Sequence, residues 1–306
     1  MKIPVVFCFD NNFALPAYVA ITSLSFYAND QTQYLVYCVV NKDLTDNNRK
    51  HIQSLSNKNL KLQFIEAKST FEKSHQHRGI TESSYYRLML HDLIPNENKI
   101  IYLDVDVLIN NDLTELYNLN LDENIIGGIK NLYIHQVFEK HLVNISYWKE
   151  KFQNAKYTYF NAGVLLMNLN QIRSTEIWKE WIELAKQKWE YHDQDILNIT
   201  CMNRILYLPP KYNATYPIRA RGASLWDLFS REELTEAPVI YHFTASKPWD
   251  SKYMDQSKVW WDFVINHTTE YNYYLKRYNE LDTINKKMRR FTAKGKRIFT
   301  KLFRSF

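Results

Sequence analysis

The stretch KIIYLDVDVLI, residues 99–109, places two aspartates at the end of an apolar run that is typical of a buried β-strand. Asp104 and Asp106 are two positions apart, so at a strand end both side chains point to the same side. Ligands of open α/β sheets bind at the carboxyl ends of strands. A divalent cation relieves the repulsion between two neighbouring carboxylates. The stretch therefore favours a metal site, with a solvated turn as the structural alternative.

Apolar runs and helical patterns alternate through most of the chain. The runs predict strands at 4–9, 34–40, 61–67, 125–129, 160–169 and 239–244, and the helical patterns predict helices at 16–27, 44–56, 83–93, 171–189 and 257–281. Strands that are apolar throughout and separated by helices are typical of a mostly parallel sheet with helices on both faces. We therefore expect an α/β fold over residues 1–255, followed by a helical region over 256–306.

Aromatic residues are unusually frequent, at 15% of the composition. Flat rings stack on bases and sugars, but they also fill large cores, and the core interpretation is favoured here. Within 171–189, apolar side chains recur at helical spacing at Trp178, Trp181, Ile182, Ala185 and Trp189. We expect this stripe to pack inside the protein.

The three cysteines show no CxxC pair and no histidine at zinc-ligand spacing. Cys8 and Cys38 lie in strand-like runs, where a free cysteine packs as a small apolar side chain. The first apolar run is too short for a signal-peptide core, and no run of about eighteen apolar residues is present to span a bilayer. These features predict a protein of a reducing compartment, the cytoplasm.

His242 follows a late apolar strand in the segment VIYHFTASKPWD, with Lys247 five residues further on. A histidine in this position is commonly a core residue, which is the structural alternative. An imidazole joined to two carboxylates would also make a three-ligand site for Mn²⁺ or Mg²⁺ that leaves positions for diphosphate oxygens. A lysine ammonium nearby would neutralise a leaving phosphate.

Two further segments carry polar groups suited to a ligand. In the first, HDQD at 192–195, Asp193 and Gln194 offer groups that hydrogen-bond sugar hydroxyls, although Asp193 would also cap the following helix. In the second, Asn161-Ala162-Gly163 opens an apolar strand, where small residues permit close approach of a ligand or form a bulge.

These segments resemble glycosyltransferase family 8, the retaining enzymes that include bacterial lipooligosaccharide α-galactosyltransferases and glycogenins. The matching segments, in the family's order, are FCFDNNFALPAYVAITSL (7–24), YYRLML (85–90), IIYLDVDVLI (100–109), YFNAGVLLMNL (159–169), HDQDILN (192–198) and HFTASKPW (242–249). They span residues 7–249, about four-fifths of the chain. The resemblance implies a GT-A fold and a UDP-sugar donor.

The resemblance also implies roles for individual residues. Mn²⁺, with Mg²⁺ as the substitute, would be held by Asp104, Asp106 and His242. The donor would contact Cys8, Asp10, Asn12, Arg87, Asp104, Val105, Asn161, Ala162, Asp193, Gln194, Ala245 and Lys247. Of the donor set, Cys8, Asp10 and Asn12 would lie at the nucleotide and Lys247 at the diphosphate. The catalytic residues would be Gln194 and Asp193, with Gln194 on the reactive face of the anomeric carbon.

The segment between His242 and Lys247 departs from the family pattern, since it has Ala245 where glycine is usual and is one residue shorter. This difference bears on backbone contacts to phosphate more than on the histidine and lysine roles. A glutamine is a poor nucleophile, so retention of configuration favours attack by the acceptor on the front face of the donor, with Gln194 positioning charge.

Residues 286–306 carry nine Lys or Arg and no acidic residue, whereas the whole chain has a net charge of +6. The rest of the chain is therefore slightly acidic, which argues against nucleic acid as a partner. Met288, Phe291, Ile298, Leu302 and Phe306 fall near one helical face of the segment. Such a basic amphipathic helix predicts peripheral association with an anionic membrane surface at the inner face of the cell membrane. A solvated, disordered tail or contact with nucleic acid is the alternative.

The resemblance leaves three functions open. The first is transfer of galactose or glucose from a UDP-hexose to lipooligosaccharide or lipopolysaccharide. The second is a transferase of the same fold with a protein or another glycan as acceptor. The third is a nucleotide- or carbohydrate-binding protein without activity, which the presence of Asp104, Asp106, His242 and Lys247 disfavours. A phosphatase of the DxDx(T) type is disfavoured because Leu108 stands in place of threonine.

Overall fold

A computed structural model describes residues 1–68, 71, 82–131, 158–215, 230–244, 247–249 and 257–268. Contacts within the chain divide it into two units, Met1–His242 and Phe243–Phe306. Helix α12 (Ser257–His267) belongs to the second unit, and the described strands belong to the first. The division expected near residue 255 stays a prediction because it falls outside the described residues, as does the basic segment 286–306.

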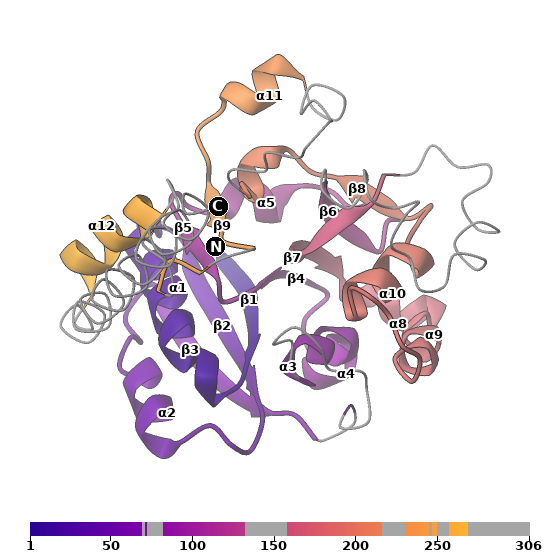
Figure 1. The fold of residues 1–306 in the computed structure, drawn as a ribbon, viewed down its shortest axis with the longest axis horizontal. Helices are drawn as coiled ribbons and strands as arrows, with labels where there is room; N and C mark the ends of the chain where they lie inside the picture. The colour runs from indigo at the N-terminus through magenta and orange to yellow at the C-terminus, as the bar shows by residue number, and fades with distance from the viewer. Residues whose placement is uncertain are drawn as a thin grey trace, which may run out of the picture. The chain divides into compact units, whose positions relative to one another are not determined.

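A seven-stranded sheet forms the centre of the first unit, in the order β3-β2-β1-β4-β7-β6-β8 (Figure 1). Its strands are β1 (Lys2–Phe9), β2 (Gln33–Val40), β3 (Leu60–Glu66), β4 (Lys99–Leu103), β6 (Ile126–Lys130), β7 (Phe160–Asn168) and β8 (Ile205–Tyr207). Strands β3, β2, β1 and β4 pair in parallel, as do β6 and β8, whereas β7 is antiparallel to both neighbours. The predicted mostly parallel α/β fold is confirmed, with β7 as the reversed strand.

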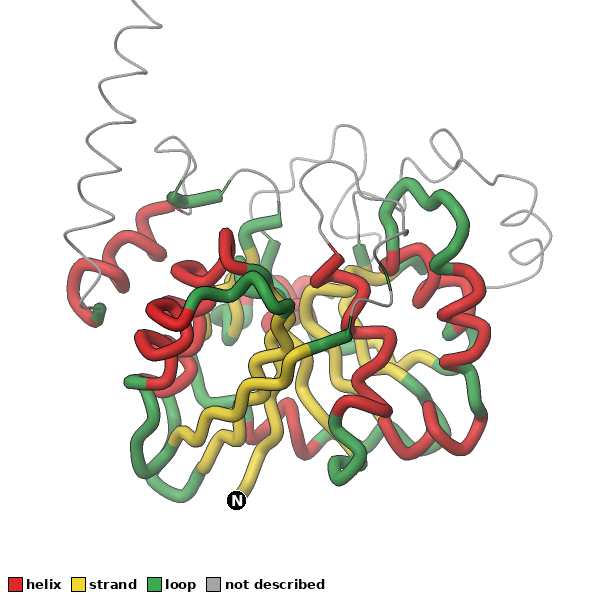
Figure 2. Tube along the Cα trace, turned by 90° about the horizontal axis from the view of Figure 1, so that it is seen from below, coloured by secondary structure: helices red, strands yellow, loops and turns green. Residues whose placement is uncertain are grey.

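Alternate residues of β1 face two different cores, as expected for a strand buried on both sides. Val5 and Phe7 pack in a core with α1 (Ala14–Phe26) and α2 (Asp46–Gln53). Val6 and Cys8 pack in a core with α4 (Leu90–Leu93), α8 (Leu169–Thr175), α9 (Trp178–Leu184) and α10 (Asp193–Thr200). Helices therefore cover both faces of the sheet (Figure 2).

The apolar run at 99–109 forms two strands, so the single strand expected from its sequence is wrong. Strand β4 pairs with β1 and β7 in the large sheet. Strand β5 (Val107–Ile109) pairs instead with β9 (Ile240–His242) in a separate two-stranded sheet. Because the two halves of the run pair with different sheets, the chain turns between them. Asp104 and Asp106 lie on this turn.

The helices predicted at 83–93 and 171–189 are both interrupted. The first consists of α3 (Glu82–Tyr85), the 3-10 turn η2 (Tyr86–Met89) and α4. In the second, Glu176 adopts a left-handed conformation with φ 54° and ψ 20°, which ends α8 before α9 begins. The expected core role of the stripe is confirmed, since Trp181, Ala185 and Trp189 are buried and Trp178 and Ile182 are partly buried against the same core.

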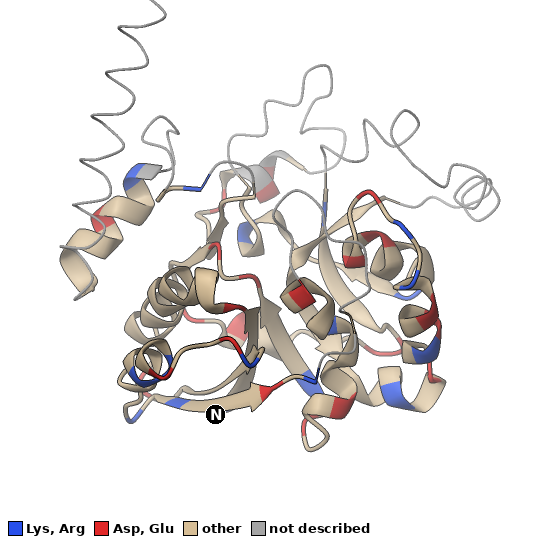
Figure 3. Cartoon of the chain, turned by 60° about the horizontal axis from the view of Figure 1, so that its bottom comes forward, with Lys and Arg blue, Asp and Glu red and all other residues tan. Residues whose placement is uncertain are grey.

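The remaining described elements are η1 (Asn11–Phe13), α5 (Thr114–Asn118), η3 (Pro210–Tyr212) and α11 (Arg231–Thr235). Lys and Arg are interspersed with Asp and Glu over the described part of the chain (Figure 3). Among the described residues, no helix has both the length and the apolar character needed to cross a membrane.

Candidate active site

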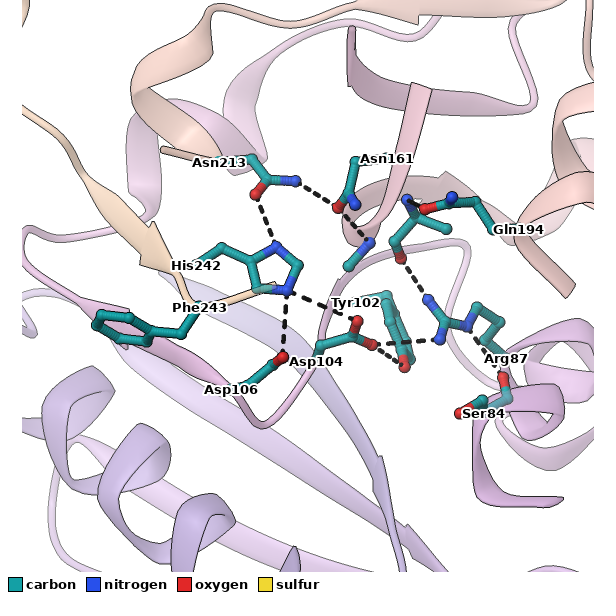
Figure 4. Close-up of polar contacts among 12 residues, drawn as sticks. Ser84, Arg87, Tyr102, Asp104, Asp106, Asn161, Gln194, Asn213, His242 and Phe243 are labelled. Carbon is teal, nitrogen blue, oxygen red and sulfur yellow. Dashed lines mark hydrogen bonds and ion pairs between the residues drawn. The ribbon is translucent and has the colours of Figure 1, made fainter. Parts of the chain in front are cut away.

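Three side chains that offer metal ligands meet where β4 leaves the large sheet and β9 ends (Figure 4). His242 Nε2 lies 3.2 Å from Asp106 Oδ1 and 3.9 Å from Asp104 Oδ2. One ligand atom from each residue lies within 4.8 Å of the others. The register of β5 against β9 pairs Val107 with His242, and this pairing brings the histidine beside the two aspartates. The structure thus brings together the three residues expected to bind a metal.

The geometry of this cluster fits a divalent cation. Ligand atoms that surround one cation at about 2.1 Å stand roughly 3–4 Å from each other, and the histidine-to-aspartate separations fall in that range. Two carboxylates and one imidazole are a donor set that suits Mn²⁺. His242 is buried, whereas Asp104 is partly exposed, so the cluster has one side open to further oxygen ligands.

Gly163 of β7 forms the floor of the cluster. A Cβ added to this residue would lie 2.2 Å from His242 Cε1 and 2.7 Å from Asp104 Oδ2, which is closer than real Cβ atoms approach other atoms. The carbonyl of Gly163 also accepts a hydrogen bond from Asp104 N at 2.8 Å. The absence of a side chain at Gly163 is what allows the aspartate and the histidine to lie against β7.

Arg87 joins the metal-binding candidates to the start of α10. Its Nε lies 2.7 Å from Asp193 Oδ2, and its Nη2 lies 3.2 Å from Asp104 Oδ1. The guanidinium also donates to the carbonyls of Ser84 and Ala162. Burial lowers the pKa of Arg87, but Asp104 and Asp193 outweigh it and hold the pKa above its usual value. Arg87 therefore stays charged and fixes one oxygen of each carboxylate.

Tyr102 is a further contact of Asp104 that the sequence reasoning missed. Its hydroxyl donates to Asp104 Oδ1 at 2.7 Å, and Arg87 lies over its ring at 4.5 Å from the centroid. The sequence does indicate this contact, because Tyr102 stands two positions before Asp104 at a strand end, where such residues point to the same side. Tyr102 and Arg87 both bind Oδ1 and leave Oδ2 facing His242 (Figure 4).

Asp193 is the first residue of α10 and not its N-cap, so the capping alternative is wrong. The cap position belongs to His192, whose φ of 56° and ψ of −130° form a backbone conformation that costs roughly 1–3 kcal/mol in a residue other than glycine. Burial raises the pKa of Asp193 to about 7, against the opposing effect of Arg87. The chain thus holds a buried carboxyl and a strained backbone at one point, which is typical of functional sites.

Gln194 is held by hydrogen bonds at both ends of its carboxamide. Its Oε1 accepts from Ala162 N at 2.9 Å, and its Nε2 donates to Tyr159 Oη at 3.2 Å. The Tyr159 hydroxyl in turn donates to Asp195 Oδ1 at 2.7 Å. Burial raises the pKa of Asp195 to about 6, although hydrogen bonds from Tyr191 N–H and Tyr159 lower it. Sequence reasoning singled out Gln194 but not its partner Tyr159.

The residues expected at the nucleotide lie at the carboxyl end of β1, next to β4 in the sheet. Cys8 is buried, and burial raises the pKa of its thiol far above the usual range, so this cysteine is not a thiolate nucleophile. Asp10 follows β1 and accepts a hydrogen bond from Asn12 N at 2.8 Å. Val105 is buried between the two aspartates.

Lys247 lies in the second unit, where its Nζ donates to the carbonyl of Phe243 at 2.8 Å. Ala245, expected beside the diphosphate, falls outside the described residues. The roles assigned to Lys247 and Ala245 therefore stay predictions.

The mostly parallel sheet, with Asp104 and Asp106 after the carboxyl end of β4 and His242 of β9 beside them, has the GT-A fold, and solved glycosyltransferase structures share this fold. The apo structure of WbbM, a bifunctional glycosyltransferase, matches 90% of this chain and 51% of its own with a TM-score of 0.75 and 22% identity. The galactosyltransferase LgtC, in complex with donor and acceptor sugar analogs, matches 87% of this chain and 97% of its own with a TM-score of 0.69 and 24% identity.

The family follows from the sequence match. Residues 4–253 match the profile of Glycosyl transferase family 8, and the chain belongs to that family. General stress protein A of Bacillus subtilis is 25% identical over 81% of this chain and 87% of its own length. Lipopolysaccharide 1,2-glucosyltransferase of Escherichia coli is 26% identical over 55% of this chain. The match spans about half, 49%, of the length of that enzyme.

Proposed function

We propose that this glycosyltransferase is a retaining enzyme that transfers galactose or glucose from a UDP-hexose to a saccharide acceptor in a Mn²⁺-dependent reaction. The observation that carries the proposal is the meeting of Asp104, Asp106 and His242 beside the Arg87–Asp193 ion pair. The cluster has the donor set for a cation, and the ion pair has polar groups for sugar hydroxyls. Both lie at the carboxyl edge of the sheet, where α/β proteins bind their ligands.

Different residues of the site would bind the cation, the donor sugar and the diphosphate. Asp104, Asp106 and His242 would hold the cation, and Mg²⁺ is the alternative to Mn²⁺. When bound, the cation supplies positive charge for the diphosphate that leaves with the nucleotide. Asp193 and Asn161 would bind hydroxyls of the donor sugar, and Lys247 would neutralise diphosphate charge.

Retention of configuration would follow from attack on the front face of the donor. The Gln194 carboxamide is a poor nucleophile, and the hydrogen bonds from Ala162 N and to Tyr159 Oη fix its position. The oxygen of the acceptor hydroxyl would bond to the anomeric carbon as the bond from that carbon to the diphosphate oxygen breaks. The hydroxyl proton would pass to the departing diphosphate. Gln194 would orient its dipole toward the positive charge that develops at the anomeric centre.

The proposal is tested by offering UDP-galactose and UDP-glucose with a saccharide acceptor and recording NMR spectra of the product. We expect one of the two donors to be consumed and the new glycosidic bond to have the α configuration of the donor. A β-linked product would contradict the retaining mechanism, and transfer from neither UDP-hexose would contradict the donor assignment.

We further propose that the acceptor is lipooligosaccharide or lipopolysaccharide at the inner face of the cell membrane. Relatives named as lipopolysaccharide 1,2-glucosyltransferase and lipopolysaccharide 1,3-galactosyltransferase support the acceptor class. The basic segment 286–306 supports binding to an anionic surface, with roughly 1 kcal/mol from each Lys or Arg near the lipid. We expect the chain to sediment with anionic vesicles and to be released at about 0.5 M salt. Equal sedimentation after deletion of 286–306 would contradict the role of this segment.

A further inference from the structure

A chain of hydrogen bonds connects His242 to the backbone of β7 through two asparagine side chains (Figure 4). His242 Nδ1 lies 2.8 Å from Asn213 Oδ1. Asn213 Nδ2 donates to Asn161 Oδ1 at 2.8 Å, and Gly163 N donates to the same Asn161 oxygen at 2.9 Å. Asn213 and His242 are both buried, at 4% and 3% exposed. Asn213 is therefore the link between the imidazole and the strand.

The donor and the acceptor in each of these hydrogen bonds can be assigned by starting from the backbone amide of Gly163. The amide of Gly163 has a proton and only donates, so the Asn161 atom that faces it is the oxygen. That oxygen also receives the side chain of Asn213, so the facing Asn213 atom is the NH₂ group. The oxygen of Asn213 then faces His242 Nδ1, and an oxygen only accepts. Nδ1 must therefore carry the proton.

A proton on Nδ1 leaves the lone pair of the neutral imidazole on Nε2. This is the nitrogen that faces Asp106 Oδ1 at 3.2 Å and Asp104 Oδ2 at 3.9 Å. A metal-binding imidazole needs this tautomer, and a hydrogen bond to the other ring nitrogen is what selects it. We infer that Asn213 is a positioning residue that fixes the tautomer and orientation of His242 for cation binding. This inference rests on the metal-dependent function proposed above.

The same side chain ties the metal cluster to the candidate donor site. Asn161, which Asn213 holds through its oxygen, is followed by Ala162, whose amide donates to Gln194 Oε1. The Asn213 carboxamide thus bonds through its oxygen to His242, a metal-binding candidate, and through its nitrogen to Asn161, a donor-binding candidate. A substitution that removes only one of these hydrogen bonds separates the two effects.

Backbone hydrogen bonds hold the segment around Asn213 in place independently of the Asn213 side chain. Asn213 N donates to Pro210 O at 3.1 Å, and Ala214 N donates to Ile240 O at 2.9 Å. His242 N donates to Ala214 O at 3.1 Å, so the backbone of this segment is bound to β9 on both sides of residue 241. Changing the Asn213 side chain should therefore leave β9 paired. Its effect should fall on the imidazole and on Asn161.

The experiment compares Mn²⁺ binding by the wild-type chain, Asn213→Ala and Asn213→Asp, measured by electron paramagnetic resonance without donor. Asn213→Ala removes the acceptor for Nδ1–H, and we expect the Mn²⁺ Kd to rise about 10–100-fold. Asn213→Asp keeps a carboxylate oxygen as acceptor, so its Kd should stay at or below the wild-type value. The Asp side chain places an acceptor against Asn161 Oδ1, so the Kd for UDP-hexose, measured with saturating Mn²⁺, should rise about fivefold or more.

Asn168→Ala is the matched control. Asn168 stands at the opposite end of β7, where its carboxamide donates to Asp122 O and Asn124 O and accepts from Gln171 N. Its loss should lower Tm without changing the Kd for Mn²⁺. A wild-type Kd in Asn213→Ala, or an equal rise in Asn168→Ala, would overturn the role of Asn213 while leaving the proposed function intact. Absence of Mn²⁺ binding by the wild-type chain would overturn both.

Discussion

Gly163→Ala is expected to abolish both Mn²⁺ binding and sugar transfer, with activity reduced at least about 10²-fold. The new methyl group would lie 2.2 Å from His242 Cε1, 2.9 Å from His242 Nε2 and 2.7 Å from Asp104 Oδ2. Movement of the imidazole would disturb the hydrogen bond that holds its Nδ1 to Asn213 Oδ1 at 2.8 Å. Either the histidine or the aspartate must therefore leave the cluster. Titration with Mn²⁺ and a transfer assay measure the two effects.

Gly127→Ala provides the control for this prediction. Gly127 lies on β6, and its added Cβ would be 3.2 Å from the side-chain ends Leu121 Cδ2 and Leu208 Cδ2 and 3.3 Å from Leu166 Cβ, with none of the metal-binding candidates among these contacts. The control should therefore change stability but leave the Kd for Mn²⁺ near that of the wild-type chain. If Gly163→Ala bound Mn²⁺ as well as Gly127→Ala, the cluster at Asp104 and His242 would not be the metal site.

The parts of the site that the sequence predicts are those in which neighbouring residues face one ligand. Asp104 and Asp106 are two positions apart after an apolar strand, and the end of such a strand is where a parallel sheet binds ligands. Asp193 and Gln194 stand side by side at the start of one helix. In both cases the local spacing is enough to suggest a shared site.

The contacts that the sequence does not predict join segments that are far apart along the chain. Asn213 bonds to Asn161 and His242, which lie 52 and 29 residues away along the chain. Arg87 of η2 pairs with Asp193 of α10. No local pattern around Asn213 marks it as a partner of a histidine 29 residues away.

The interruption of the 99–109 run could not be predicted from the sequence, because it too depends on contacts with distant segments. The apolar pattern resumes directly after Asp106, because the apolar strand residues before Asp104 and after Asp106 are all largely buried. The two halves differ in the strand with which they pair: Leu103 pairs with β7, and Val107 pairs with β9. Hydropathy reports burial and not the identity of the neighbouring strand, so the break could not be read from it. The left-handed Glu176 between α8 and α9 is a similar case, because its conformation is unusual for glutamate.

Asp106→Asn is expected to remove most activity, at least about 10²-fold, without unfolding the chain. The amide has nearly the same size as the carboxylate but lacks the negative charge that a divalent cation requires of its oxygen ligands. Asp112→Asn is the matched control. The Asp112 carboxylate accepts hydrogen bonds from Asn29 N, Tyr34 Oη and Thr114 N, and it lies outside the metal cluster. This control should lower stability and keep the response to metal.

The measurement that tests the central claim most directly is UDP release from the accepted UDP-hexose in the presence of chelator, Mn²⁺ or both. For the wild-type chain and Asp112→Asn, we expect chelator to abolish release and excess Mn²⁺ to restore it. For Asp106→Asn, we expect little release at any Mn²⁺ concentration at which the wild-type chain is saturated. Full release by the wild-type chain in chelator, or by Asp106→Asn in Mn²⁺, would contradict a reaction that depends on a cation held by Asp104, Asp106 and His242.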